Sequence, residues 1–474
     1  MLLFSVILTT DFRGVAAEKC YNPKSDFYPF MNAKTAYEYV HATVGRPEST
    51  CQPVQIWMLA RHGTRYPDAD KILQLKNLTK IRDEILGNDA QKDIDMCEKD
   101  LAKLKDWNPD ENMNSSNDEM LTPQGEKDLI DLAHRLKSVF SDLITEDHSA
   151  EDYVFRSTKY PRALDSMTAF SSSMFPDTNV TYIEPPENDT LLLLHENCPA
   201  WINDFKENDV VAEMNIFKNG PEVQNVLENV SSRLGYKSIL DYKTVNLMYE
   251  MCIYETAWNV QDHIKNDYVS PWCLVFTKEE LQVLEYVKDL DYFYCCGPGR
   301  RMSKKIGCNP LVDMFHNFEK LESSDEYSKK GTFYFAHSQT VQTFLAALDF
   351  SIDSPPMTSK NYDSQKNRSF RSSIQGSFAS NFFAVFYRCS GVEDQDKVMM
   401  YVGEKAITPK GCTKDLCSWK YIKKQLSSTV ENCGTKFCYA TAGASQLDHG
   451  FKYILGLIMS LSFLLRMSIV KILP

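Results

Sequence analysis

The chain has 474 residues and a formal net charge of −12, with 43% hydrophobic and 12% aromatic residues. This length exceeds one typical hydrophobic core, and the composition excludes a wholly disordered protein. The acidic balance argues against a nucleic-acid partner, because such proteins carry a basic stripe. A local group of arginines can nevertheless attract a small anionic substrate.

The first residues are typical of an exported protein. Residues 2–8 are apolar and a small-residue stretch follows at 15–17, which predicts a signal peptide over residues 1–17. A buried first strand is the alternative. All fourteen cysteines follow this segment without the CxxC pairs and interleaved histidines of zinc sites, so we expect disulfides. Six sequons fit the same route as glycosylation sites: Asn77, Asn114, Asn179, Asn188, Asn229 and Asn367.

Three short apolar segments predict buried strands, at residues 55–60, 152–155 and 332–336. Each precedes a helix-like stretch. Pro161 suits the first turn of one such helix, and Ser338 is expected to cap another. Strands that alternate with helices predict an α/β sheet, whose ligands bind outside the carboxyl ends of the strands.

The pattern changes between residues 185 and 330, where apolar residues recur at helical spacing. We expect a mainly α-helical cap inserted here, which divides an α/β domain into two parts, 18–184 and 331–442. Residues 68–117 form a smaller polar excursion. Two apolar runs between residues 378 and 401 predict further strands of the same sheet.

The last residues, 443–474, contain small residues, a polar spacer and an apolar tail. This order is typical of a glycolipid (GPI) anchor signal, and it predicts a protein on the extracellular face of the plasma membrane. The uninterrupted apolar stretch Tyr453–Leu465 is shorter than the roughly 20 residues of a membrane span. Arg466 and Lys471 weaken both interpretations, of which the anchor is favoured.

Five cationic or titratable residues are expected at one edge of the sheet. Arg61, His62 and Arg65 follow the first predicted strand, Arg156 follows the second and His337 follows the third. Crowded guanidiniums repel one another unless an anion lies among them, and their forked donors match phosphate oxygens. Positive neighbours lower a histidine pKa, so that one imidazole stays neutral and nucleophilic. The pattern predicts phosphoryl transfer through a phosphohistidine.

The string RHGTRYP at residues 61–67 resembles the phosphate-binding motif of the histidine acid phosphatase family. The resemblance extends through LTPQGEKDL, FRSTKYPRALDS and AHSQT, while SPWC, VLEYVKDLDYF and FRSS…ASNFFAVFYRC are similar to the multiple inositol polyphosphate phosphatase branch. It implies a histidine-phosphatase-like α/β sheet domain with an α-helical cap and no metal or other cofactor. It also implies His62 as the nucleophile and a phosphate held by Arg61, Arg65, Arg156 and His337.

One residue departs from the family pattern. This branch usually has a glutamate two residues after the second histidine, where it protonates the leaving group, and this chain has Gln339. An amide cannot release a proton, and general-acid catalysis typically contributes about 10²- to 10⁴-fold. We therefore expect a slow phosphatase, one that prefers acidic leaving groups, or a catalytically silent binder.

Further basic residues are tentative phosphate contacts. The basic run at residues 297–305 is more simply explained as a solvent-exposed face. If it borders the cleft, its side chains would contact additional phosphates of the substrate. His134 and His316 lie in helix-like stretches and are expected to be structural. The tentative contacts are Lys159, Arg162, Arg300, Arg301, Lys304 and Lys305.

Three functions remain open from the sequence. The leading one is a phosphomonoesterase that acts on inositol polyphosphates, with 2,3-bisphosphoglycerate as a further substrate implied by the resemblance. The second is a broad-specificity acid phosphatase. The third is a surface ectodomain that binds phosphate without turnover, which Gln339 favours.

Overall fold

The computed structural model describes residues 20–47, 50–89, 94–145, 150–176, 180, 182–207, 209–322 and 328–439. The expected signal peptide, the Asn179 sequon and the expected anchor signal lie outside these ranges. Among the helices of the described ranges, none has the length and apolar character needed to span a bilayer.

Three parallel strands form the centre of the sheet, and β4 lies between β1 and β2. Their carboxyl ends therefore meet at one edge, at Arg61, Ser157 and Ala336. The predicted strands are confirmed, and of those expected after residue 378 β5 pairs antiparallel with β1 and β6 pairs antiparallel with β5. The strands are β1 (Cys51–Arg61), β2 (Tyr153–Ser157), β3 (Tyr182–Ile183), β4 (Gly331–Ala336), β5 (Asn381–Cys389), β6 (Asp396–Val402), β7 (Lys405–Ile407) and β8 (Cys417–Ser418).

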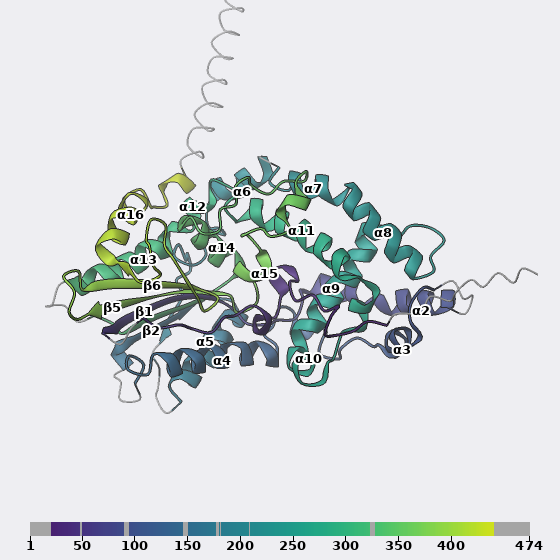
Figure 1. The fold of residues 1–474 in the computed structure, drawn as a ribbon, viewed down its shortest axis with the longest axis horizontal. Helices are drawn as coiled ribbons and strands as arrows, with labels where there is room; N and C mark the ends of the chain where they lie inside the picture. The colour runs from purple at the N-terminus through teal and green to yellow at the C-terminus, as the bar shows by residue number, and fades with distance from the viewer. Residues whose placement is uncertain are drawn as a thin grey trace, which may run out of the picture.

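Helices cover both faces of the sheet (Figure 1). Successive side chains of a strand point to opposite faces, so Met58 packs on one side and Trp57 on the other. This explains why β1 reads as a continuous apolar run. One face is covered by α4 (Pro123–Val139) and α5 (Pro161–Met174), and the other by α13 (Cys308–Glu319), α14 (Ser338–Ala347) and α16 (Trp419–Glu431).

A second hydrophobic core lies in the helical cap, on the right of Figure 1. It includes residues from the 68–117 excursion as well as from the insertion. By contrast, α13 packs on the sheet, although its residues fall inside the predicted 185–330 cap. The remaining helices are α1 (Ala69–Lys76), α2 (Leu78–Asp89), α3 (Glu98–Asp106), α6 (Pro199–Glu207), α7 (Ala212–Lys218), α8 (Pro221–Arg233), α9 (Tyr242–Trp258), α10 (Val260–Asn266), α11 (Lys278–Cys295), α12 (Ser303–Ile306) and α15 (Ser372–Gln375).

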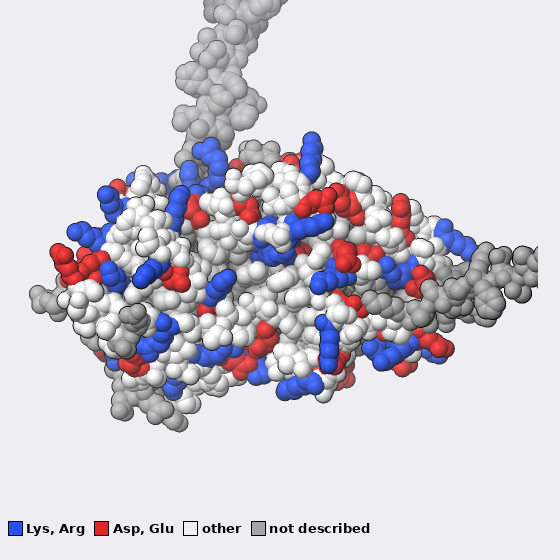
Figure 2. Space-filling view, viewed as in Figure 1, with Lys and Arg blue, Asp and Glu red and all other residues white. Residues whose placement is uncertain are grey.

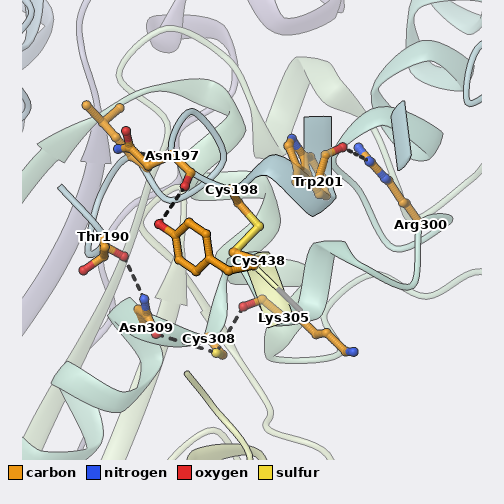
Figure 3. Close-up of a disulfide and its surroundings, with 11 residues drawn as sticks. Thr190, Asn197, Cys198, Trp201, Arg300, Lys305, Cys308, Asn309 and Cys438 are labelled. Carbon is orange, nitrogen blue, oxygen red and sulfur yellow. Dashed lines mark hydrogen bonds between the residues drawn. A yellow bond between two sulfur atoms is a disulfide. The ribbon is translucent and has the colours of Figure 1, made fainter. Parts of the chain in front are cut away.

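Six disulfides join twelve of the fourteen cysteines, as expected for this composition. Two of them fasten the last described segment to the body of the protein, and Figure 3 shows one of these, Cys198–Cys438. Cys295 and Cys296 are free. The other pairs are Cys20–Cys97, Cys51–Cys389, Cys252–Cys273, Cys308–Cys433 and Cys412–Cys417.

The surface carries acidic and basic side chains in close alternation on the face drawn in Figure 2. Asn114 is half-buried and donates its amide to the Glu111 carbonyl. Glycosylation of the described sequons stays a prediction that their exposure permits. The exposed ones are Asn77, Asn188, Asn229 and Asn367.

Candidate active site

The loop after β1 is held against α4 by a close backbone approach. A β-carbon on Gly63 would lie 2.1 Å from the Gly125 carbonyl oxygen, so neither loop position nor helix tolerates a side chain there. The Thr64 carbonyl accepts from the backbone N–H and the hydroxyl of Thr122. The LTPQG segment thus fixes the path of the RHGTR loop.

His62 and His337 face each other across the sheet edge, with ring centroids 5.6 Å apart. The Nδ1 of His62 lies 2.8 Å from the Gly63 carbonyl, which assigns the proton to Nδ1 and leaves the Nε2 lone pair free. The Nε2 of His337 is 3.0 Å from the Thr158 hydroxyl, and the Tyr160 ring packs edge-on against it.

Both histidines are held in the neutral form. Burial lowers the pKa of His62 well below its usual value, and the charges of Arg61, Arg65 and Arg162 act in the same direction. Burial and the same three arginines lower the pKa of His337. A neutral His62 remains a nucleophile in mildly acidic solution.

Three arginines present unsatisfied donors next to these imidazoles. The buried Nε–H groups of Arg61, Arg65 and Arg162 find no partner within the described residues, and the same holds for Arg156. An unpaired buried donor costs roughly 1–3 kcal/mol, which an anion in the pocket would recover. Arg61 is also fixed through Nη1, which donates to the Ala33 and Gly376 carbonyls.

Glu119 connects two of the arginines, and no sequence motif predicts this contact. Its Oε2 lies 2.9 Å from Nη1 of Arg162, and its Oε1 lies 3.4 Å from Nη2 of Arg65. Sequence reasoning also missed His195, whose charge acts on His337. Glu119 and His195 both lie in segments without a recognisable sequence motif.

The structure does not bring Arg156 into this cluster, which corrects the sequence prediction. Along β2, Phe155 faces α5, so Arg156 faces the opposite side, where its Nη2 lies 2.5 Å from Oδ1 of buried Asp189. Its charge acts on Asp313, whereas the cationic side chains acting on His62 are Arg61, Arg65 and Arg162. Arg162, an additional phosphate contact in the sequence analysis, lies close enough to His62 and His337 for its charge to lower their pKa values.

The other tentative contacts are placed differently. Arg300 is buried, with its guanidinium 3.4 Å from the Trp201 ring centroid (Figure 3). Its Nε donates to Asp204. Lys304 pairs with Asp349. Both are engaged by partners in the chain and not by the cluster around His62. Three are exposed: Lys159, Arg301 and Lys305.

The first turn of α14 carries the position that normally supplies the acid. Gln339 is its second residue and is half-buried. His337 occupies the N-cap position, and Ser338, expected as the cap, donates instead to the Gly376 carbonyl at 3.2 Å. The site therefore contains an amide where the family pattern has a carboxyl group.

A lysine cluster adjoins the arginines and was also missed in the sequence. Lys34, Lys71 and Lys288 surround Glu250 of α9, with Lys71 Nζ 2.6 Å from its Oε2. Burial lowers the pKa of Lys34, and Arg65 lowers it further, which places this lysine next to the phosphate pocket. The three lysines come from separate elements, so no single sequence motif contains all three.

The fold and the cluster around His62 define a class, a phosphate-ester hydrolase with a histidine nucleophile among arginines. A family model described as "Histidine phosphatase superfamily (branch 2)" matches residues 54–402. The chain therefore belongs to this superfamily, as the RHGTRYP string indicated.

Known relatives carry more specific names. Multiple inositol polyphosphate phosphatase 1 of Drosophila melanogaster is 30% identical over 430 residues, covering 89% of each chain. The phytase from D. castellii has a TM-score of 0.65 at 16% identity, over 85% of this chain and 84% of that one. The Bifidobacterium longum multiple inositol polyphosphate phosphatase in complex with inositol hexasulfate scores 0.63 at 15% identity, over 85% and 98%. The solved structures confirm the predicted fold class.

Proposed function

We propose that this protein hydrolyses phosphate monoesters of inositol polyphosphates through a phosphohistidine intermediate. The observation that carries the proposal is the neutral His62 with a free Nε2 among Arg61, Arg65 and Arg162. The names of the relatives, which include inositol polyphosphate phosphatases and a phytase, support the substrate class.

The reaction uses the site in two steps. The arginines hold the equatorial oxygens of a phosphate group, each charge-assisted hydrogen bond contributing about 1.5–3 kcal/mol. Nε2 of His62 attacks phosphorus as the ester P–O bond breaks, and the departing alkoxide takes a proton. Water then attacks the phosphohistidine and releases inorganic phosphate.

The lysine cluster supports a polyphosphate over a simple monoester. Lys34, Lys71 and Lys288 lie around the Glu250 carboxylate, so the cap wall beside the pocket carries several cationic side chains. Positive charge there attracts the phosphates that are not being transferred. A monoester has no group to place against it, which separates this proposal from the broad acid phosphatase.

Gln339 limits the reaction at the leaving group. It can donate a hydrogen bond but not a proton, so an alcohol leaving group must be protonated by water or by the substrate itself. Substrates with acidic leaving groups need little protonation, so the amide in place of a general acid lowers their rate of hydrolysis only slightly. The proposal therefore includes a slow turnover of inositol esters.

The cellular setting belongs to the same proposal. Six disulfides support an oxidising compartment, which is extracellular or lumenal. Attachment to the outer face of the plasma membrane through a GPI anchor at 443–474 is the further step, and it rests on the sequence pattern alone.

The test compares an aryl phosphate with inositol hexakisphosphate in the wild type and in Gln339→Glu and His62→Ala variants. We expect His62→Ala to abolish both activities. Gln339→Glu should accelerate hydrolysis of the inositol ester by about 10²-fold or more and leave the aryl ester nearly unchanged. 2,3-Bisphosphoglycerate is assayed in parallel as the second candidate substrate.

Other outcomes identify the alternatives. Equal rates on monoesters and on inositol hexakisphosphate in the wild type would favour the broad acid phosphatase. No activity in any variant, with retained phosphate binding, would favour the silent ectodomain. Activity that survives in His62→Ala would remove the nucleophile assignment.

A further inference from the structure

Two adjacent cysteines lie outside the six disulfides. Cys295 ends α11, and Cys296 is its C-cap residue. Their Sγ atoms are 2.8 Å apart. Non-bonded carbon atoms prefer about 3.5–4.0 Å, and sulfur is larger than carbon. The two sulfurs are therefore closer than ordinary packing allows and are directed at each other.

The surroundings hold this pair in place. The Cys295 carbonyl accepts from Nη1 of Arg300 at 3.0 Å. Arg300 is itself held by Asp204 and by the Trp201 carbonyl, and Figure 3 shows the second of these contacts. Cys296 donates its backbone N–H to the Tyr292 carbonyl at 3.1 Å. With the backbone anchored on both sides, the sulfurs are held in mutual contact.

The two thiols differ in access. Cys296 is fully buried in a small apolar cluster with Leu194, Trp201 and the Cys198–Cys438 disulfide. Cys295 is partly exposed. An external reagent therefore reaches Cys295 first, and the buried partner is placed to react only with its neighbour.

We propose that Cys295 and Cys296 form a redox site that closes into a seventh, vicinal disulfide. The oxidant is an external disulfide, carried by a thiol–disulfide oxidoreductase or a small-molecule disulfide. The Cys295 thiolate attacks one of its sulfurs, forms a mixed disulfide and releases one thiolate. The deprotonated Cys296 sulfur then attacks Sγ of Cys295 and releases the second thiolate. Both cysteine protons end on the two released thiols.

The new bond is expected to be strained and easily reduced. Adjacent Cα atoms are about 3.8 Å apart across a trans peptide, below the usual 4.4–6.8 Å of disulfides. Strained disulfides have more oxidising potentials and behave as labile or regulatory bonds. The ring closes at the end of the helix that carries Tyr292, a half-buried side chain whose pKa is raised by burial, while the nearby charge of Arg61 opposes that rise. The site thus lies under one wall of the phosphate pocket.

The first test counts thiols in the full chain, denatured without reductant and alkylated. We expect no alkylated cysteine and an intact mass two hydrogen atoms below that of a chain with six disulfides. Two alkylated thiols at Cys295 and Cys296 would overturn the proposal. A mass increase from a small thiol attached to either cysteine would overturn it as well.

The second test follows reduction in glutathione buffers of decreasing potential. The Cys295 and Cys296 thiols should appear before those of the other six pairs. A Cys295→Ser/Cys296→Ser variant is the matched control and should show no early thiols, while Cys296→Ser alone should leave one reactive thiol without reductant. Reduction of the Cys295–Cys296 bond together with the other six disulfides, or after them, would contradict the proposal. These measurements do not depend on catalytic activity.

Discussion

Asp128 holds Thr64 by two hydrogen bonds to one carboxylate oxygen. Its Oδ2 accepts from the Thr64 backbone N–H at 2.9 Å and from the Thr64 hydroxyl at 2.6 Å. Thr64 lies between the histidine and the second arginine of the RHGTR loop. Asp128 is completely enclosed, so these bonds are not exchanged with water.

The Asp128→Ala variant is therefore expected to loosen the phosphate-binding loop. Each donor left unsatisfied costs roughly 1–3 kcal/mol, and weaker binding of inorganic phosphate should accompany the lower stability. Chemical denaturation and phosphate inhibition measure the two effects. Asp131→Ala is the control, because Asp131 on the same helix forms a partly exposed pair with Lys127, expected to contribute at most about 1 kcal/mol. Equal effects of both substitutions would contradict the role of Asp128.

The placement of two arginines predicts opposite phenotypes. Arg162→Ala should lower kcat/KM by on the order of 10- to 100-fold with little change in stability, because it loses one or two charge-assisted bonds to phosphate. Arg156→Ala leaves the buried Asp189 carboxylate unpaired and should destabilise the fold by about 3–5 kcal/mol.

A double variant keeps this comparison interpretable if Arg156→Ala does not fold. Arg156→Met/Asp189→Asn removes both charges, so we expect recovered stability and nearly unchanged kcat/KM. A large loss of kcat/KM in this folded double variant would return Arg156 to the phosphate site.

The sequence was sufficient for the features that depend on local patterns. The apolar runs of β1, β2 and β4 identified the sheet edge, and their order along the chain brought His62 and His337 together. Arg156 was misplaced because the strand-end rule locates a residue along a strand but not its face. Since β2 directs Phe155 to α5, the next residue must point away.

Long-range contacts explain what the sequence did not reveal. Glu119 and Lys288 reach the pocket through the placement of the cap against the sheet, which no local sequence pattern specifies. The packing of α13 depends on long-range contacts in a similar way. Helical spacing predicts that α13 is a helix, but it does not say that its apolar face packs against the sheet.

Glu119 combines an unusual backbone with a negative charge between two phosphate-binding groups. Its φ of 53° lies in the left-handed region, which costs a non-glycine residue about 1–2 kcal/mol. Glu119→Gly should therefore be more stable than the wild type. Glu119→Gln and Glu119→Gly should both bind inorganic phosphate more tightly, by up to about fivefold, because the carboxylate no longer competes for Arg65 and Arg162. Weaker phosphate binding in both variants would mean that Glu119 positions the arginines instead.

Glu255 gives the fold a specific dependence on pH. Burial raises the pKa of this carboxyl group from 4.5 to about 7, although it accepts from Trp107 Nε1 and the Ser270 hydroxyl. Between these pH values the folded state binds more protons than the unfolded state, so the free energy of unfolding falls as pH rises. The shift of about 2.5 pKa units corresponds to about 3 kcal/mol, fully lost above pH 7.

Denaturation curves between about pH 4 and pH 8 test this dependence. Glu255→Gln should flatten the decline between 4.5 and 7, because the amide does not titrate. Asp128, whose pKa burial raises from 3.8 to about 6, contributes in an overlapping but more acidic window. Asp128→Asn is therefore the control that should flatten only the part below about pH 6. A dependence of stability on pH that is the same in Glu255→Gln as in the wild type would show that the group is ionised in the folded protein throughout this range.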